Sequence, residues 1–199
     1  MESSESTSKL ANKEIYAIDE LANLKKIDEI NNSIACEFGD LVIRTSSDND
    51  IKEITELWAN LATVQQIYAP DRFSFNSCGK DWQAFVKRKI SKKYNLLLVA
   101  HKKGDAEIRG FLYLQTITLP SSDLVLKAVI EDIYTKPQYR RQGIASKIMD
   151  VSLEWASNQS VKQVDFITLT NEKIKGLSAF YSRFQNKFKE NVNLELVTF

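Results

Sequence analysis

The chain has 199 residues, of which 43% are hydrophobic and 27% are charged, and its formal net charge is +1. This length is enough for one substantial core, and the near-neutral balance gives no support for a nucleic-acid or membrane-surface partner. The longest apolar runs, such as Leu96–Ala100, have the length of a strand, so we expect no membrane span. The first residues lack the basic and apolar regions of a signal peptide.

The two cysteines, Cys36 and Cys78, follow no metal-ligand spacing. A disulfide framework needs more cysteines, and no cluster of His, Cys and carboxylate residues suggests a metal. We therefore expect a cytoplasmic protein that binds no metal.

Residues 1–38 are expected to form an acidic N-terminal extension. Residues 1–12 are rich in Ser, Glu, Thr and Lys and are predicted to be disordered, whereas apolar residues from Ile15 to Ile30 recur near helical spacing. Residues 1–40 carry nine acids and four bases. This pattern predicts an acidic helix that packs on the domain or forms a homodimer, and the sequence does not decide between them.

Residues 39–199 are expected to form the domain proper. Alternating or continuous apolar runs predict strands, and apolar stripes behind capping residues predict helices. In chain order the predicted elements are strand 41–44, helices near 51–61 and 82–90, strands 96–100, 110–117 and 124–135, helix 142–158, strand 161–169, helix 172–188 and strand 192–198. This mixture of hairpins and crossovers predicts an α/β (α+β) fold, a mixed, mostly antiparallel sheet flanked by helices.

The most informative stretch is the junction between strand 124–135 and helix 142–158. A turn containing Pro137 leads into Arg140-x-x-Gly143-x-Ala145, which opens the helix. The first backbone N–H groups of a helix have no partners within it, and the helix dipole favours an anion there. Because glycine lets a ligand approach the backbone closely, this junction predicts a phosphate site.

These features together resemble the GNAT superfamily of acyl-CoA N-acetyltransferases over about residues 41–199. Arg140, Gly143 and Ala145 match the signature Arg/Gln-x-x-Gly-x-Gly/Ala. Residues 133–137 match Leu/Ile-x-Val-x-Pro, with Thr135 in place of Val, and a Phe-Tyr helix lies downstream. The run of residues 130–134, Ile-Glu-Asp-Ile-Tyr, further resembles a strand of diamine and polyamine acetyltransferases and suggests an amine acceptor.

The resemblance implies acetyl-CoA as cosubstrate and assigns residues to it. The strand before the turn would pair with the pantetheine arm and acetyl group, and the turn would hold the pyrophosphate. The residues that this assigns to cofactor binding are Ile133, Tyr134, Thr135, Arg140, Arg141, Gln142, Gly143, Ile144, Ala145 and Ser146. Asn171 lies ten residues before Tyr181 rather than the family's seven, so its contact with the cofactor is left open.

Transfer to an amine requires a proton acceptor, an oxyanion donor and a proton for the leaving thiolate. Glu131 lies two residues before Ile133, so a regular strand places both side chains on one face and Asp132 on the other. Glu131 is therefore our candidate base or substrate contact, and Asp132 is second choice. The resemblance implies the Ile133 N–H as oxyanion donor, if a bulge frees it, and Tyr181 as general acid. Each of these side chains could instead be purely structural.

The remaining features are a basic run, the single histidine and the segments on the acceptor side. The basic residues Lys87–Lys89 lie on a helix whose other face is apolar, and we interpret them as a solvated face. His101, the only histidine, is expected to be an exposed loop residue. The loops 68–79 and 118–123 and the two helices near 51–61 and 82–90 are expected to form the acceptor side, with Asp71, Phe73 and Phe75 as candidates to line it.

The preferred function is an N-acetyltransferase that moves an acetyl group directly to a small primary amine in a ternary complex. A protein N-acetyltransferase, a non-catalytic acyl-CoA sensor and a structural domain without a ligand remain alternatives.

Overall fold

The computed structural model describes residues 34–68, 70, 79–90, 95–119, 125–159, 161–168, 176–187 and 193–198. Within this part, seven strands form one sheet in the order in which they follow along the chain, β1 to β7. The strands are β1 (Ala35–Phe38), β2 (Leu41–Thr45), β3 (Asn95–Lys102), β4 (Ile108–Leu119), β5 (Val125–Thr135), β6 (Gln163–Thr168) and β7 (Asn193–Thr198). Neighbours from β1 to β5 are antiparallel, whereas β5, β6 and β7 are parallel.

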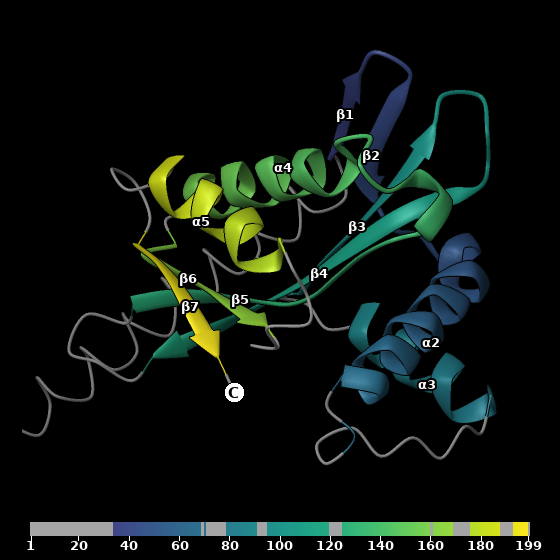
Figure 1. Ribbon diagram of the computed structural model, residues 1–199, viewed down its shortest axis with the longest axis horizontal. Coiled ribbons are helices and arrows are strands. Elements are labelled where there is room, and N and C mark those ends of the chain that lie inside the picture. Colours follow the sequence, from purple (N-terminus) through teal and green to yellow (C-terminus); the bar gives the residue numbers. More distant parts are fainter. Residues whose placement is uncertain are drawn as a thin grey trace, which may run out of the picture.

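Helices cover both faces of this sheet (Figure 1). The helices are α2 (Ile51–Tyr68), α3 (Gly79–Ile90), α4 (Ile144–Asn158) and α5 (Leu177–Lys187), with short 3-10 turns at Asp48–Asp50 and Pro137–Tyr139. Helix α4 connects the parallel strands β5 and β6, and α5 lies between β6 and β7 in the chain. The predicted mixed sheet with flanking helices is thus confirmed. None of the described helices has both the length and the apolar character needed to cross a membrane.

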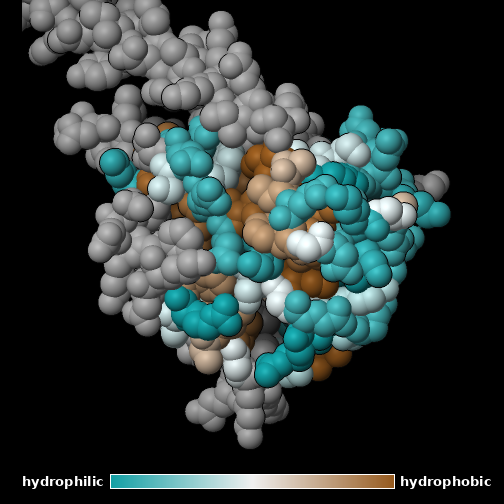
Figure 2. All heavy atoms as spheres, turned by 90° about the horizontal axis from the view of Figure 1, so that it is seen from above, coloured by the Kyte–Doolittle hydropathy of each residue, from teal (hydrophilic) through white to brown (hydrophobic). Residues whose placement is uncertain are grey.

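The core has two parts, one on each face of the sheet. Helices α4 and α5 cover the first face, where Ile148, Trp155 and Phe184 pack with the strands. Helices α2 and α3 cover the second, where Ile54, Trp58 and Val86 pack with other residues of the same strands. Strand β3 contributes alternate residues to both parts, which explains its continuous apolar run. Seen from above, most of the outer surface of the described residues is hydrophilic, with apolar residues in patches between (Figure 2).

Two observations concern the predicted N-terminal boundary. Residues Ala35–Phe38, which we assigned to the extension, form β1 and pair with β2, so the sheet begins before Gly39. The predicted disordered and helical segments at residues 1–33 lie outside the described residues.

Candidate active site

The predicted phosphate turn lies between β5 and α4, and its backbone has an unusual conformation. Arg141 and Gly143 both have positive φ, 65° and 82°, and Gly143 is the N-cap of α4. Among the described residues no side chain caps this helix, and its first turn contains no acid. Gly143 is exposed, and nothing lies within 4 Å of the position that a Cβ would take. The N-terminus of α4 is therefore open to an anion.

Two arginines lie beside this turn. Arg140 donates from Nε to the carbonyl oxygen of Thr135 at 3.0 Å, which connects the turn to the end of β5. Arg183, on α5, donates from Nη2 to Oγ of Ser146 in the first turn of α4 at 3.5 Å. The sequence analysis did not single out Arg183, because its position beside α4 depends on the packing of the two helices. These cations add to the positive field of the helix N-terminus.

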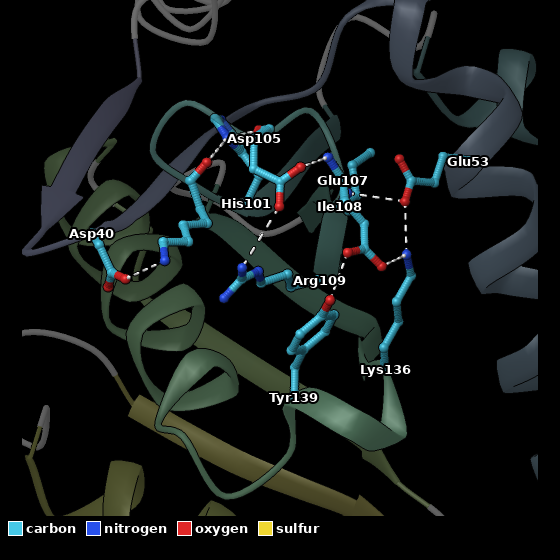
Figure 3. A network of polar contacts seen from close by, with 10 residues as sticks. Asp40, Glu53, His101, Asp105, Glu107, Ile108, Arg109, Lys136 and Tyr139 are labelled. Atoms are coloured by element: carbon cyan, nitrogen blue, oxygen red, sulfur yellow. Dashed lines mark hydrogen bonds and ion pairs between the residues drawn. The ribbon is translucent and has the colours of Figure 1, made fainter.

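A polar network holds the start of the turn against α2 and β4 (Figure 3). Nζ of Lys136 donates to both Glu53 and Glu107 at 2.8 Å, and the Tyr139 hydroxyl donates to Glu107 at 2.6 Å. The bonds from Lys136 and Tyr139 lower the pKa of Glu107. The guanidinium of Arg109 lies 4.5 Å from the centre of the Tyr139 ring. These contacts fix the turn from outside the phosphate-binding segment itself.

The second half of β5 has one edge that no described strand covers. Strand β6 pairs with β5 only as far as Ile130 opposite Phe166, although β5 continues to Thr135. The N–H of Lys136 donates to Arg109 across the β4 side at 2.9 Å. Because backbone groups alternate in direction along an antiparallel strand, those of Ile133 and Thr135 point away from β4. The carbonyl of Thr135 accepts from Arg140, which agrees with this direction. We call this edge of β5 beyond Ile130, which no described strand pairs with, the opening beside β6.

A β-bulge at Glu131 changes which face its neighbours occupy. Tyr113 of β4 is opposite Asp132, and the next residue, Leu114, is opposite Ile130, so Glu131 has no partner on β4. The predicted alternation was therefore wrong at this point. Asp132 accepts from Nε1 of Trp58 on α2 at 2.8 Å, Glu131 contacts α3, and Ile133 packs on the opposite face with the α4 cluster. The extra residue brings both carboxylates to the α2–α3 face.

Glu131 forms an ion pair with Lys89 of α3, which corrects our interpretation of the basic run as a solvated face. Nζ of Lys89 lies 2.5 Å from Oε2 of Glu131 and 4.4 Å from the centre of the Tyr113 ring. Lys87 and Arg88 are exposed as predicted, but only 18% of the Lys89 side chain is exposed. The sequence could not reveal this pair, because the two residues are 42 positions apart.

Asp132 occupies the more enclosed position of the two carboxylates. Although the residue as a whole is half-buried, burial of its carboxyl group raises its pKa, and the nearby charge of Glu131 acts in the same direction. The hydrogen bonds from Trp58 and Gln65 and the charge of Lys89 oppose this shift without cancelling it. Burial likewise raises the pKa of Tyr113. This face thus combines two carboxylates with an aromatic ring.

Tyr181 lies on the other face at the point where β5 and β6 separate. Its ring centre is 5.2 Å from that of Phe166, the residue opposite Ile130 in the last pair of the two strands. Tyr181 is 3% exposed and belongs to the core under α4 and α5. Glu131 directly follows Ile130, so Glu131 and Tyr181 flank the opening from opposite faces of the sheet.

The observed residues fit an extended ligand with a phosphate at one end. The open N-terminus of α4 provides phosphate donors, and the outward backbone groups of Ile133 and Thr135 can pair with an amide-containing arm. The buried Thr135 hydroxyl at the end of β5 has no hydrogen-bond partner among the described residues. The N-terminus of α4 thus suits the phosphate of such a ligand, and the free edge of β5 suits its amide-containing arm.

The other residues singled out in the sequence analysis do not lie among the described residues beside the opening. His101 lies in β3 and is half-buried, so the expectation of an exposed loop residue was wrong; its Nδ1 lies 3.1 and 3.0 Å from the carbonyl oxygens of Lys102 and Asp105 in the hairpin. Asn171 and the proposed acceptor-side residues Asp71, Phe73 and Phe75 lie outside the described residues. Within the described part of the chain, no group of three or more His, Cys, Asp and Glu residues could hold a metal ion.

Comparisons with known proteins agree with this geometry. A family model described as an acetyltransferase (GNAT) domain matches residues 93–185, which include the bulge, the turn and Tyr181. No curated protein matches the chain in sequence.

Several solved structures share the fold. An acetyltransferase from Vibrio fischeri is 24% identical, with a TM-score of 0.51 over 62% of this chain and 93% of its own. A predicted acetyltransferase with acetyl-CoA from Clostridium acetobutylicum is 16% identical, with a TM-score of 0.55 over 72% and 88%. An aminoglycoside acetyltransferase from an uncultured soil metagenomic sample is 19% identical, with a TM-score of 0.55 over 72% and 90%.

Proposed function

We propose that the chain, which carries a GNAT acetyltransferase domain over residues 93–185 and depends on acetyl-CoA, acetylates a small primary amine by direct transfer in a ternary complex. The observation that carries the proposal is the bulge at Glu131, which presents two carboxylates and the Tyr113 ring on one face of the opening. Carboxylates and an aromatic face are the groups that bind an ammonium ion. The acceptor is therefore a cation before it reacts.

The donor and the acceptor approach the opening from different sides. Bound acetyl-CoA supplies the acetyl group as a thioester, with its pyrophosphate at residues 140–146 and its arm along Ile133–Thr135. The acceptor lies on the α2–α3 face. Glu131 takes the proton from the acceptor ammonium, directly or through a water, and the Ile133 N–H donates to the carbonyl oxygen as charge develops on it. Direct attack then needs no enzyme nucleophile.

Tyr181 completes the proton transfers from the opposite face. A phenol hydroxyl can donate a hydrogen bond, so Tyr181 is our candidate for giving a proton to the leaving thiolate. Asp132 places a second carboxyl group beside Glu131 on the same face of the sheet.

The test is release of free thiol from acetyl-CoA over a panel of polyamines, amino acids, amino sugars, aminoglycosides and N-terminal peptides. We expect turnover with a small amine. Turnover confined to the peptides would favour the second candidate, a protein N-acetyltransferase. Thermal stabilisation by CoA without turnover of any amine would contradict both.

With a good acceptor, Glu131→Gln and Tyr181→Phe are each expected to lower kcat at least ten-fold while acetyl-CoA binding is retained, since general acid–base groups typically contribute about 10²–10⁴-fold. Unchanged turnover in both variants would refute the assigned roles.

A further inference from the structure

Lys89 is an amine that already lies where the acceptor should bind. Its Nζ contacts the candidate base Glu131 at 2.5 Å and lies over the Tyr113 ring at 4.4 Å and the Phe85 ring at 5.5 Å. Lys87, two positions earlier on α3, is exposed. Lys89 is thus the member of the basic run that is directed into the sheet.

This position has a consequence for a free acceptor. Lys89 already contacts Oε2 of Glu131 and the face of the Tyr113 ring, so a free acceptor ammonium ion competes with it for these two groups. Flexible attachment to the same chain gives a group an effective concentration in the millimolar range. In the absence of free amine, Lys89 is therefore the amine that Glu131 contacts.

Building on the function proposed above, we infer that Lys89 is itself an acceptor and that the enzyme acetylates its Nζ within the same chain. Glu131 takes one proton from the Lys89 ammonium, and Nζ forms an amide bond to the acetyl carbon as the carbon–sulfur bond breaks. The leaving thiolate receives a proton from Tyr181, and a second proton from Nζ is released as the amide forms. Tyr181 regains its proton from solvent, and one free thiol is released per acetylated chain.

The experiment incubates the full-length protein with acetyl-CoA, without amine, and follows Lys89 and Lys87 by peptide mass spectrometry. Direct chemical reaction with acetyl-CoA favours the more exposed Lys87, so Lys87 is the internal control. We expect Lys89 to be acetylated at least ten-fold faster than Lys87. The rate per chain should stay constant over a fifty-fold dilution of the protein, because the reaction is intramolecular. Glu131→Gln should reduce the rate at Lys89 to that at Lys87.

A matched pair of variants tests the same point without relying on mass spectrometry. Lys89→Arg keeps a cation beside Glu131 but removes the amine, and it should abolish the single release of thiol, whereas Lys87→Arg should retain it. Equal rates at Lys89 and Lys87, or a rate that falls in proportion to protein concentration, would overturn the inference.

The amine panel separates this inference from the proposed function. Turnover of a small amine without modification of Lys89 would refute the self-acetylation alone. Modification of Lys89 without turnover of any small amine would support it and count against a small-amine acceptor. The absence of both reactions would refute both.

Discussion

Gly143→Ala tests the role of the turn at α4 by changing its backbone preference alone. Gly143 has φ +82°, and nothing lies within 4 Å of an added Cβ, so alanine brings conformational strain without a clash. For an L-residue the left-handed conformation costs about 1–2 kcal/mol. Because the turn is exposed, we expect it to relax out of this conformation, and acetyl-CoA binding must then restore it. The same free energy therefore predicts a rise in Kd of about 5–30-fold.

Gly104→Ala is the matched control. Gly104 has φ +78°, also with nothing within 4 Å, but it lies in the hairpin between β3 and β4. With the same conformational cost of about 1–2 kcal/mol, its replacement by alanine should lower Tm by about 2–8 °C and leave acetyl-CoA binding unchanged. Calorimetric titration with acetyl-CoA and thermal unfolding measure the two effects. If Gly143→Ala changes Kd by less than two-fold, or if both variants change it equally, the turn does not bind the pyrophosphate through its backbone.

Three further variants test the electrostatics around the opening. Arg183→Gln should raise the Kd for acetyl-CoA about three- to ten-fold by removing a cation beside Ser146, whereas Lys52→Gln, the same charge change on an exposed residue of α2, should not. Burial raises the pKa of Asp132, so its charge destabilises the fold increasingly as pH rises above the ordinary aspartate value of about 3.9. Asp132→Asn should therefore have a higher Tm than the natural protein at pH 7 and an equal one at pH 3; a lower Tm at pH 7 would contradict this. The pKa of Glu107 is lowered by Lys136 and Tyr139, so its stabilising effect is present above about pH 4.3 and is lost as pH falls through its lowered value. Glu107→Gln should accordingly lower Tm at pH 7 but not at pH 2. If the variant lowers Tm by the same amount at both pH values, the charge of Glu107 is not responsible.

The order of the elements was predictable from the sequence, because apolar periodicity reports directly which residues face a core. The continuous run in β3 and the stripe of α4 are clear examples. Strand β1 was missed because its four residues follow an acidic segment with helical spacing and none of them is fully buried. A short, partly exposed edge strand of this kind leaves little apolar periodicity in the sequence.

The site was only partly predictable, for two physical reasons. One inserted residue in a strand reverses the face of everything beyond it, and residues 130–134 carry no glycine or other local signal of the bulge. The contact between Lys89 and Glu131 depends on how α3 packs against the sheet. Motif and spacing could therefore indicate Glu131 and Tyr181 as candidates, which stay predictions, but could not assign Glu131 and Ile133 to opposite faces of the sheet.

The two separate parts of the core suggest how such an enzyme can change its substrate during evolution. The turn that we propose for the acetyl donor lies beside α4 and α5, while the carboxylates face α2 and α3, and the sheet lies between the two. Substitutions among the α2 and α3 residues, such as Phe85, can reshape the acceptor side without disturbing the packing beneath α4. Under the proposed function, a lineage can thus exchange acceptors while its acetyl donor stays the same, and directed evolution of specificity should begin on α2 and α3.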